Sequence, residues 1–141
     1  MYIHAIYSCR MEDIIAYGTI LFPTFVKIKE YIFIKSFLNQ DQLSDISWLK
    51  QLEKDCNYCK KEIEMSVNSW SIGAFFAGSG DAKAMDNEKM IYEFGKLLEF
   101  SWKSRAKEIF PDKDFAVEIG HELMGELGIS IAFYQKDECN L

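Results

Sequence analysis

Two cysteines three residues apart, Cys56 and Cys59 in the stretch CNYC, are the first residues whose types and spacing suggest chemistry. Such pairs occur in redox sites, in zinc sites, and as small apolar residues on one face of a helix. A redox pair needs a thiolate that is stabilised at a helix N-terminus or beside a cation, whereas this pair is predicted well inside a helix and follows Asp55. We therefore expect both cysteines to be small buried residues.

A zinc site at this pair would need two further ligands. Cys9, Cys139, His4 and His121 are the candidates, but they stand singly, and structural zinc sites are marked by two close-spaced pairs. Four cysteines in 141 residues do not form a disulfide scaffold, so we expect free thiols in a reducing compartment. The sequence predicts no metal and no cofactor, and a site joining Cys9 and Cys139 to the pair stays open as a minor alternative.

Two other stretches contain only part of a catalytic motif. HELMG (121–125) begins like the zinc-protease sequence HExxH, but Gly125 stands where the second histidine is required. GSGD (78–81) precedes a predicted helix, but it lacks the lysine of a phosphate-binding loop and carries an acid that repels phosphate. Because no complete catalytic set is present, we expect no enzyme activity. The alternative is a small enzyme that uses Glu118, His121 and Glu122, which lie close together in the sequence.

The negative charge of the chain is concentrated near its C-terminal end. The net charge is −6, and residues 112–141 contain seven acids against Lys113 and Lys136. Lysine and arginine are dispersed among acids elsewhere, which argues against nucleic-acid binding. A solvated acidic face of this kind keeps a protein soluble, and it also attracts basic protein partners. The acids that we expect to form such a face are Asp112, Asp114, Glu118, Glu122 and Glu126.

Hydrophobic periodicity predicts three helices and two hairpin-like strand pairs. Residues 11–22, 43–70 and 87–110 have apolar positions at helical spacing, and Pro23 and Pro111 end the first and the last. Residues 24–29 and 31–37 are expected to form a hairpin that turns at Lys29-Glu30, a pair without the glycine or asparagine of a tight turn. Residues 115–119 and 129–134 alternate like two strands, a further short strand is expected within 72–76, and Asp86 is expected to cap the last helix.

Strands and helices are segregated along the chain rather than alternating. This order predicts an α+β fold, with an antiparallel sheet of about four to five strands in two hairpin-like pairs and three helices mainly on one face. The length suits a single domain over residues 1–141. No apolar run is long enough to cross a membrane, and the N-terminus has no basic start followed by an apolar block. We therefore expect a cytoplasmic protein that binds no membrane.

Two segments resemble a known class of proteins. LFPTFVKIKEYIFI (21–34) and FSWKSRAKEIFPDKDFAVEIG with ISIAFYQ (100–120 and 129–135) are similar to small bacterial cytosolic immunity proteins of polymorphic toxin and contact-dependent growth inhibition systems. The similar features are an FP-x-FV entry into a hairpin and a Trp-bearing helix that leads into FP-x₃-F-x-VE and a closing strand. They cover about half of the chain and are structural residues. The Lys29-Glu30 turn departs from the Asp-Gly that is expected there.

The resemblance implies inhibition by binding. A cognate protein toxin domain, expected to be a basic nuclease, would be neutralised because the immunity protein covers its active site. In this hypothesis the acids of 112–126 speed the encounter and mimic phosphate charge. A structural or oligomeric subunit of unknown role is the main alternative, and the sequence does not fix the oligomeric state.

Overall fold

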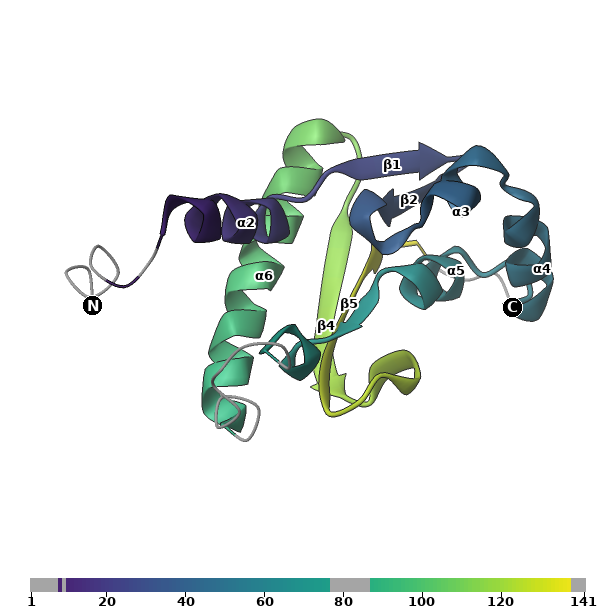
Figure 1. The fold of residues 1–141 in the computed structure, drawn as a ribbon. Coiled ribbons are helices and arrows are strands. Elements are labelled where there is room, and N and C mark those ends of the chain that lie inside the picture. Colours follow the sequence, from purple (N-terminus) through teal and green to yellow (C-terminus); the bar gives the residue numbers. More distant parts are fainter. Residues whose placement is uncertain (1–7, 9, 77–86, 138–141) are drawn as a thin grey trace.

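The computed structural model describes residue 8 and residues 10–76 and 87–137 (Figure 1). The five strands all pair antiparallel, in a two-stranded sheet β1-β2 and a three-stranded sheet β3-β5-β4. The α+β class and the number of strands predicted from the sequence are thus confirmed. In chain order the described elements are α2 (Met11–Leu21), β1 (Phe25–Ile28), β2 (Tyr31–Ile34), η1 (Lys35–Phe37), α3 (Gln40–Ser44), α4 (Ser47–Asp55), α5 (Lys60–Val67), β3 (Ser69–Ser71), η2 (Gly73–Phe76), α6 (Glu88–Ile109), β4 (Phe115–His121), η4 (Leu123–Gly125) and β5 (Ile129–Gln135).

The β1–β2 hairpin turns at Lys29-Glu30, as predicted, although neither residue is typical of a tight turn. Lys29 adopts a left-handed backbone conformation with φ of 56°. Its ammonium group lies 2.7 Å from the carboxylate of Glu53 in α4, and the hydroxyl of Tyr31 donates to the same carboxylate over 2.9 Å. The hydrogen bond from Lys29 leads the causes that lower the pKa of Glu53, against the opposing effect of burial. The turn is therefore fastened to α4 by side-chain contacts that compensate for its strained backbone.

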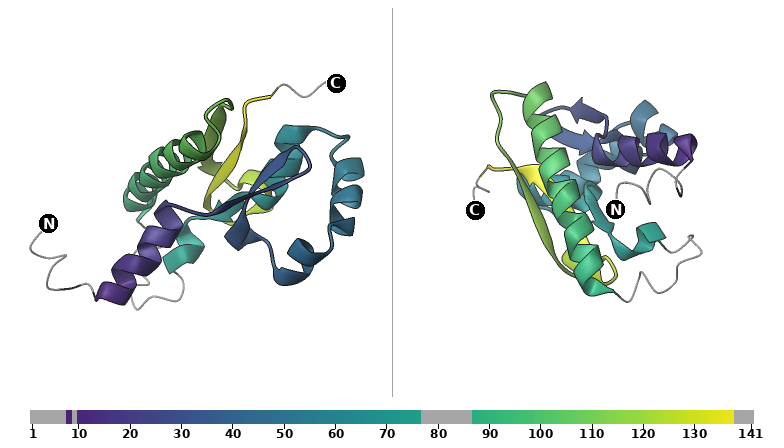
Figure 2. Two further views of the ribbon diagram at one scale, coloured as in Figure 1. Left: turned by 90° about the horizontal axis from the view of Figure 1, so that it is seen from above. Right: turned by 90° about the vertical axis from the view of Figure 1, so that its left-hand side faces the viewer.

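Helices cover both faces of the three-stranded sheet (Figure 2). Ile129, Ile131 and Phe133 of β5 point into a core that α6 closes, whereas Ala132 and Tyr134 point the other way and contact Met65 of α5. Alternate residues of a strand face opposite sides of a sheet, so β5, whose seven residues are all buried, packs against a helix on each side. The sequence prediction had placed the helices mainly on one face.

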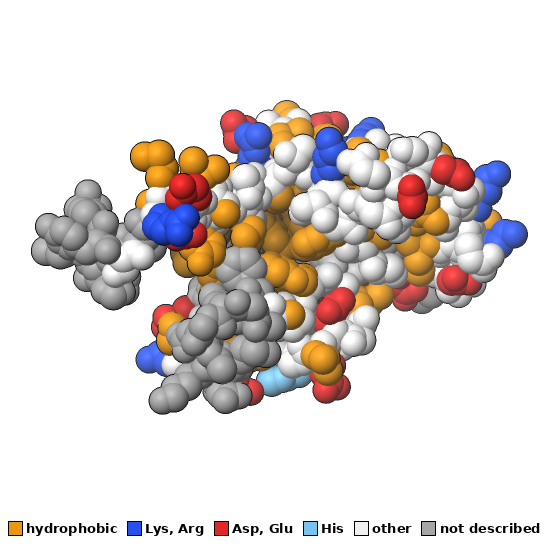
Figure 3. Space-filling model, viewed as in Figure 1, with side chains coloured by type: hydrophobic (Ala, Val, Ile, Leu, Met, Phe, Trp, Pro, Cys, Tyr) orange, Lys and Arg blue, Asp and Glu red, His pale blue; other side chains and the backbone are white. Residues whose placement is uncertain are grey.

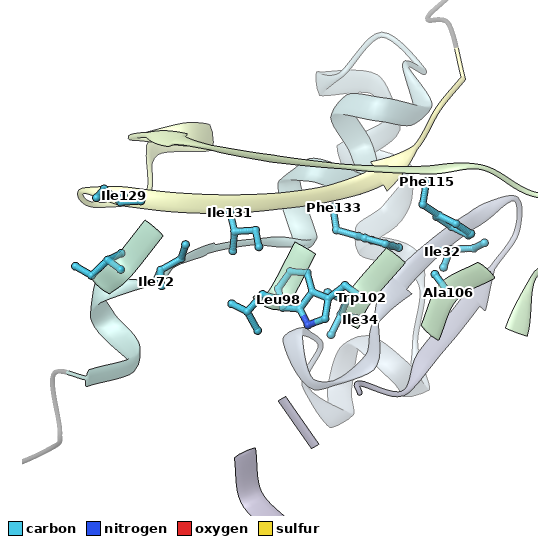
Figure 4. Packing of buried hydrophobic residues seen from close by; sticks show 11 residues of the cluster. Ile32, Ile34, Ile72, Leu98, Trp102, Ala106, Phe115, Ile129, Ile131 and Phe133 are labelled. Atoms are coloured by element: carbon cyan, nitrogen blue, oxygen red, sulfur yellow. The ribbon is translucent and has the colours of Figure 1, made fainter. Parts of the chain in front are cut away.

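Strand β2 divides the hydrophobic interior into two clusters, because all four of its residues are buried. Ile32 and Ile34 point to the cluster around Trp102 and Phe133, which Figure 4 shows from close by. Tyr31 and Phe33 point to a second cluster, which is completed by α4 and α5. A strand that is buried on both faces reads as a continuous apolar run, and the sequence YIFI has that character.

The outer edge of β2 is joined to β5 by side chains of α5 rather than by another strand. The carboxylate of Glu64, which is fully buried, accepts the backbone N–H of Ile32 over 2.8 Å and that of Gln135 over 3.0 Å. The side-chain amide of Gln135 also donates to it, over 2.9 Å. Glu64 thus satisfies backbone donors of both strands at once, which is what allows these two edges to be buried without pairing.

Asn68, one helical turn beyond Glu64, also connects β2 to β5; we call Glu64 and Asn68 together the joint. Its side-chain oxygen accepts the N–H of Ile34 over 2.9 Å, and its side-chain amide donates to the carbonyl of Ile32 over 2.9 Å and to that of Phe133 over 3.3 Å. Its own carbonyl accepts the N–H of Phe133 over 3.1 Å, so that it also starts the pairing that β3 continues. Glu64 and Asn68 together thus supply, from their side chains, the hydrogen bonds that a strand between β2 and β5 would otherwise make.

The single helix predicted over residues 43–70 is wrong, because the structure divides this segment into parts of α3, α4, α5 and β3. Asn57 and Tyr58 have left-handed backbones, with φ of 50° and 59°, and they turn the chain between α4 and α5. The apolar spacing continues across the turn, which is why periodicity alone did not reveal it. The short strand expected within 72–76 is also wrong: β3 precedes this segment, and η2 occupies most of it.

The predictions for the first and last helices are confirmed. α2 ends two residues before Pro23, and α6 runs from Glu88 to Ile109, two residues before Pro111. Asn87 caps α6, since its side chain accepts the N–H of Met90 over 3.2 Å; the predicted cap, Asp86, lies outside the described residues. The indole of Trp102 in α6 donates to the carbonyl of Ile20 over 2.8 Å and so ties α2 to the body. No helix in residues 10–76 or 87–137 has the length and apolar character to span a membrane.

Replacing Glu64 by alanine should destabilise the protein strongly. The N–H groups of Ile32 and Gln135 would stay buried without a partner, and each such group costs about 1–3 kcal/mol. We expect the free energy of unfolding to fall by about 3 kcal/mol or more, measured by urea denaturation. Glu62→Ala, on the exposed side of the same helix, should change it by less than about 0.5 kcal/mol. Equal effects of the two substitutions would contradict the role of Glu64 as a joint.

The stabilising effect of Glu64 should decrease as the pH rises. Burial raises the pKa of its carboxyl above the ordinary 4.5, and this outweighs the hydrogen bonds from Gln135 and Ile32 and the charge of Lys60. Between the unfolded and the folded pKa the native state binds more protons, so stability falls with rising pH. The difference in unfolding free energy between wild type and Glu64→Gln should be greatest below pH 4.5 and shrink above it. A difference that grows with pH would show that the hydrogen bonds outweigh burial.

Candidate functional site

The five acids predicted to form one face lie along the whole length of β4 rather than in one cluster. Asp112 and Asp114 precede the strand, Glu118 is at its centre, and Glu122 and Glu126 lie beyond its other end. Seven residues of strand extend over roughly 20 Å, so the two ends of the row act as separate charges at physiological ionic strength. Asp112 is close to Asp114 in the sequence, and Glu122 is close to Glu126. Within the described part of the chain, no hydrogen bond or ion pair joins the side chains of either pair.

Glu118 belongs to a compact cluster with residues of α5 and β5. The hydroxyl of Tyr134 donates to its carboxylate over 2.7 Å, and the ammonium of Lys61 lies 3.2 Å from the same oxygen. Lys61 also lies 4.7 Å from the centre of the Tyr134 ring, a cation–π distance. The hydrogen bond from Tyr134 and then the contact with Lys61 hold the pKa of Glu118 below 4.5, although burial opposes them. The charge of Glu118 is therefore largely neutralised by its neighbours.

The other four acids differ in how much of their charge reaches solvent. Asp114 forms an ion pair with Lys107 over 3.1 Å, and Lys107 also donates to the carbonyl of Lys113 over 2.9 Å. Asp112, Glu122 and Glu126 form no side-chain hydrogen bond or ion pair with other residues of 10–76 and 87–137. These three residues, at the two ends of β4, carry the charge that a partner could meet.

The carboxylates and imidazole of the alternative enzyme hypothesis are not brought together. Glu118 and His121 are three residues apart on β4, so their side chains point to opposite faces of the sheet. His121 is exposed and lines a cavity of about 510 Å³ with Glu88 and Glu126, beside the exposed Leu127. No group of three histidine, cysteine or acidic side chains in the described residues could hold a metal ion.

The two cysteines of CNYC differ in their surroundings. Cys56 ends α4, is buried at 8% exposure, is a free thiol, and lies 3.8 Å from the hydroxyl of Ser66. Cys59 precedes α5 and is disulfide-bonded, so the expectation of a free thiol is wrong there. The two cysteines therefore have different roles: Cys56 is a small core residue, and Cys59 forms a covalent link. The GSGD stretch also lies outside the described residues.

A cleft of about 690 Å³ opens beside the end of α2, and sequence inspection did not anticipate it. It lies between the end of α2, the segment from Ile34 to Leu38, and two tryptophans, Trp70 and Trp102. Figure 3 shows hydrophobic side chains at the floor of this hollow, beside α2. No periodicity signal marks it, because its walls combine α2 and the segment 34–43 with Trp70 of β3 and Trp102 of α6, which are distant in the sequence.

The three tryptophans are packed rather than freely exposed. Trp102 is buried at 1% exposure, and Trp48 and Trp70 are half-buried. The indole of Trp48 donates to the carbonyl of Gln42 over 3.0 Å and tilts against Phe33 at 5.8 Å. Trp70 and Trp102 both border the cleft, and of these two only Trp70 is partly exposed.

No family model matches the chain, and comparisons with curated proteins and with solved structures give no match either. The resemblance to immunity proteins therefore stays a prediction, and the site must be judged from its geometry.

Acidification should weaken the contribution of Glu118 to stability. Its folded pKa lies below 4.5, so its contribution is present above pH 4.5 and is lost as the pH falls through the folded pKa. Because the side chain is 39% exposed, we expect no more than about 1 kcal/mol. Glu118→Gln should therefore be less stable than wild type at pH 7 and approach it at pH 3 in thermal unfolding. A constant difference across this range would contradict the assignment.

The disulfide of Cys59 should be visible as missing thiols. In the purified, oxidised and denatured protein we expect two free thiols of the four cysteines, because Cys59 and its partner are blocked. After reduction all four should react. Four reactive thiols before reduction would show that the link does not form, and the count by thiol titration or mass spectrometry distinguishes the two cases.

Proposed function

We propose that this chain is a protein-binding immunity factor, which neutralises a cognate basic toxin domain by covering its active site. The observation that carries the proposal is α2, a helix in which no residue is buried although most are apolar. Met11, Ile14 and Ile15 are 76%, 59% and 61% exposed, and Phe22 just after the helix is 58% exposed. We call these four residues the α2 face; Figure 3 shows hydrophobic side chains over this helix.

The spacing of the α2 face favours a protein partner. Met11 stands three and four positions before Ile14 and Ile15, so these three residues lie on one side of the helix, and Phe22 follows just beyond its end. No charged residue occurs between Asp13 and Lys27. Contiguous exposed apolar side chains on a folded protein mark interaction sites, and large apolar residues are typical anchors of them.

Charge complementarity favours a basic partner. The net charge of the protein is −6, and Asp112, Glu122 and Glu126 present unpaired carboxylates at the two ends of β4. Fields of this kind raise the association rate of an oppositely charged protein more than they lower its dissociation rate. In this proposal the α2 face holds the toxin, and the acids speed its approach.

The alternative is a subunit that covers the α2 face with a second copy of itself. The same exposed helix favours it, since an apolar face between copies is typical of oligomers. Sedimentation of the purified chain separates the two hypotheses: a concentration-independent monomer leaves the face available to a different protein. A dimer that Ile15→Asp converts to a monomer would support the subunit instead.

Truncating the α2 face should speed dissociation of the partner. With the partner captured from the source cell and purified, Met11→Ser/Ile15→Ser should weaken binding by about 30-fold or more, mainly through the dissociation rate. The fold should be unchanged by circular dichroism, because both side chains are exposed. Leu127→Ser, at a residue that is 82% exposed elsewhere, is the matched control and should bind like wild type. Unchanged binding by the double variant would reject the α2 face as the docking surface.

Neutralising the acids should instead slow association. Asp112→Asn/Glu122→Gln/Glu126→Gln changes the net charge from −6 to −3, and we expect the association rate to fall about tenfold at low salt. The dependence of this rate on salt should also become weaker. Asp41→Asn/Glu62→Gln/Glu93→Gln gives the same net charge from exposed acids elsewhere. Equal effects of the two triple variants would show that total charge, and not the acids around β4, guides the partner.

A further inference from the structure

The cleft beside α2 has aromatic walls of fixed orientation. The ring of Phe37 lies 6.0 Å from that of Trp70 and 6.2 Å from that of Trp102, the latter edge to face at 74°. Trp102 is held by its hydrogen bond to the carbonyl of Ile20, which fixes the wall on the α2 side. Phe37 and Trp70 therefore present packed aromatic surface to the cleft, with the buried Trp102 behind them.

The polar groups at the mouth of the cleft are free to bind. The side chains of Thr24, Ser36 and Gln40 are exposed and make no hydrogen bond with other side or main chains in the described residues. Lys35 is exposed as well, and it has no ion pair there. Among the described residues that line the cleft, Lys35 is the single charged one, and none is acidic.

From these features we propose that the cleft binds a small organic anion with a flat apolar ring system and one anionic group. The rings would lie against Phe37 and Trp70, and the anionic group would meet Lys35, with Ser36 and Gln40 as neutral hydrogen-bond donors. The volume of about 690 Å³ lies within the range of small-molecule sites. A cationic ligand would be repelled by Lys35. A ligand with several negative charges would meet only this one cation among the described lining residues.

This site is distinct from the proposed docking surface. Met11 and Ile15 do not line the cleft, and none of the acids around β4 does. Binding of the anion therefore does not depend on the immunity function, and the failure of one proposal would leave the other standing.

The test uses 8-anilinonaphthalene-1-sulfonate, an anionic ring compound, and N-phenyl-1-naphthylamine, its uncharged analogue. Both should bind the purified full-length protein and gain fluorescence by energy transfer from tryptophan. Lys35→Met should weaken the sulfonate about fivefold and leave the uncharged compound unchanged, since an exposed ion pair contributes at this level. Lys27→Met, at an exposed lysine on β1 outside the cleft, should affect neither compound.

Two further variants locate the bound compound. Ser36→Trp, at an exposed position, should fill the cleft and abolish binding of both compounds while circular dichroism stays unchanged. Trp48→Phe should keep the energy transfer, because Trp48 packs against Phe33 outside the cleft. The proposal is overturned if Ser36→Trp binds like wild type, if Lys35→Met weakens both compounds equally, or if Met11→Ser/Ile15→Ser abolishes binding. The last outcome would place the compounds on the α2 face.

Discussion

The buried carboxylate of Glu64 and the amide of Asn68 are the contacts on which the rest of the structure depends. They stand between β2 and β5 and satisfy backbone groups of both, so two separate sheets share one interior. A buried carboxylate without partners would be costly, but here three donors converge on it. Because Glu64 belongs to α5 and Asn68 caps its C-terminal end, the position of this one helix sets how β2 and β5 lie relative to each other.

The joint also explains the break between α4 and α5. α5 must present Glu64 and Asn68 to the strands, whereas α4 must present Glu53 to the hairpin turn at Lys29. The break lets α4 and α5 take different directions, so that each helix lies against its own contact region. Asn57 and Tyr58 take left-handed conformations to change direction, and asparagine is one of the few residues that adopts this conformation readily.

These particulars separate what the sequence could predict from what it could not. α6, β4 and β5 follow from periodicity over long stretches, and the hairpin follows from alternation on either side of one turn. The break at residues 56–59 was hidden because Cys56 and Ile63 keep helical spacing across it, and Asn57 was the one local signal for a turn. Glu64 could not be recognised, since a glutamate beside lysines in an amphipathic helix is ordinarily exposed. The acids of 112–126 are close in sequence, but they lie along an extended strand, which separates them by more than twice the distance that a helix would.

The α2 helix is the element whose surroundings are least explained by folding alone. Its inner side contributes to the main core through half-buried Ile20 and Leu21, while its outer stripe contributes nothing to that core. Packing of Ile20 and Leu21 alone does not explain why the helix has eleven residues, most of them apolar. The end of the same helix forms one wall of the cleft. A partner on the α2 face and an anion in the cleft would therefore act on one helix from two sides. If binding of one of them changes the affinity for the other, the second changes the affinity for the first by the same factor, because coupling between two binding sites is symmetric in free energy.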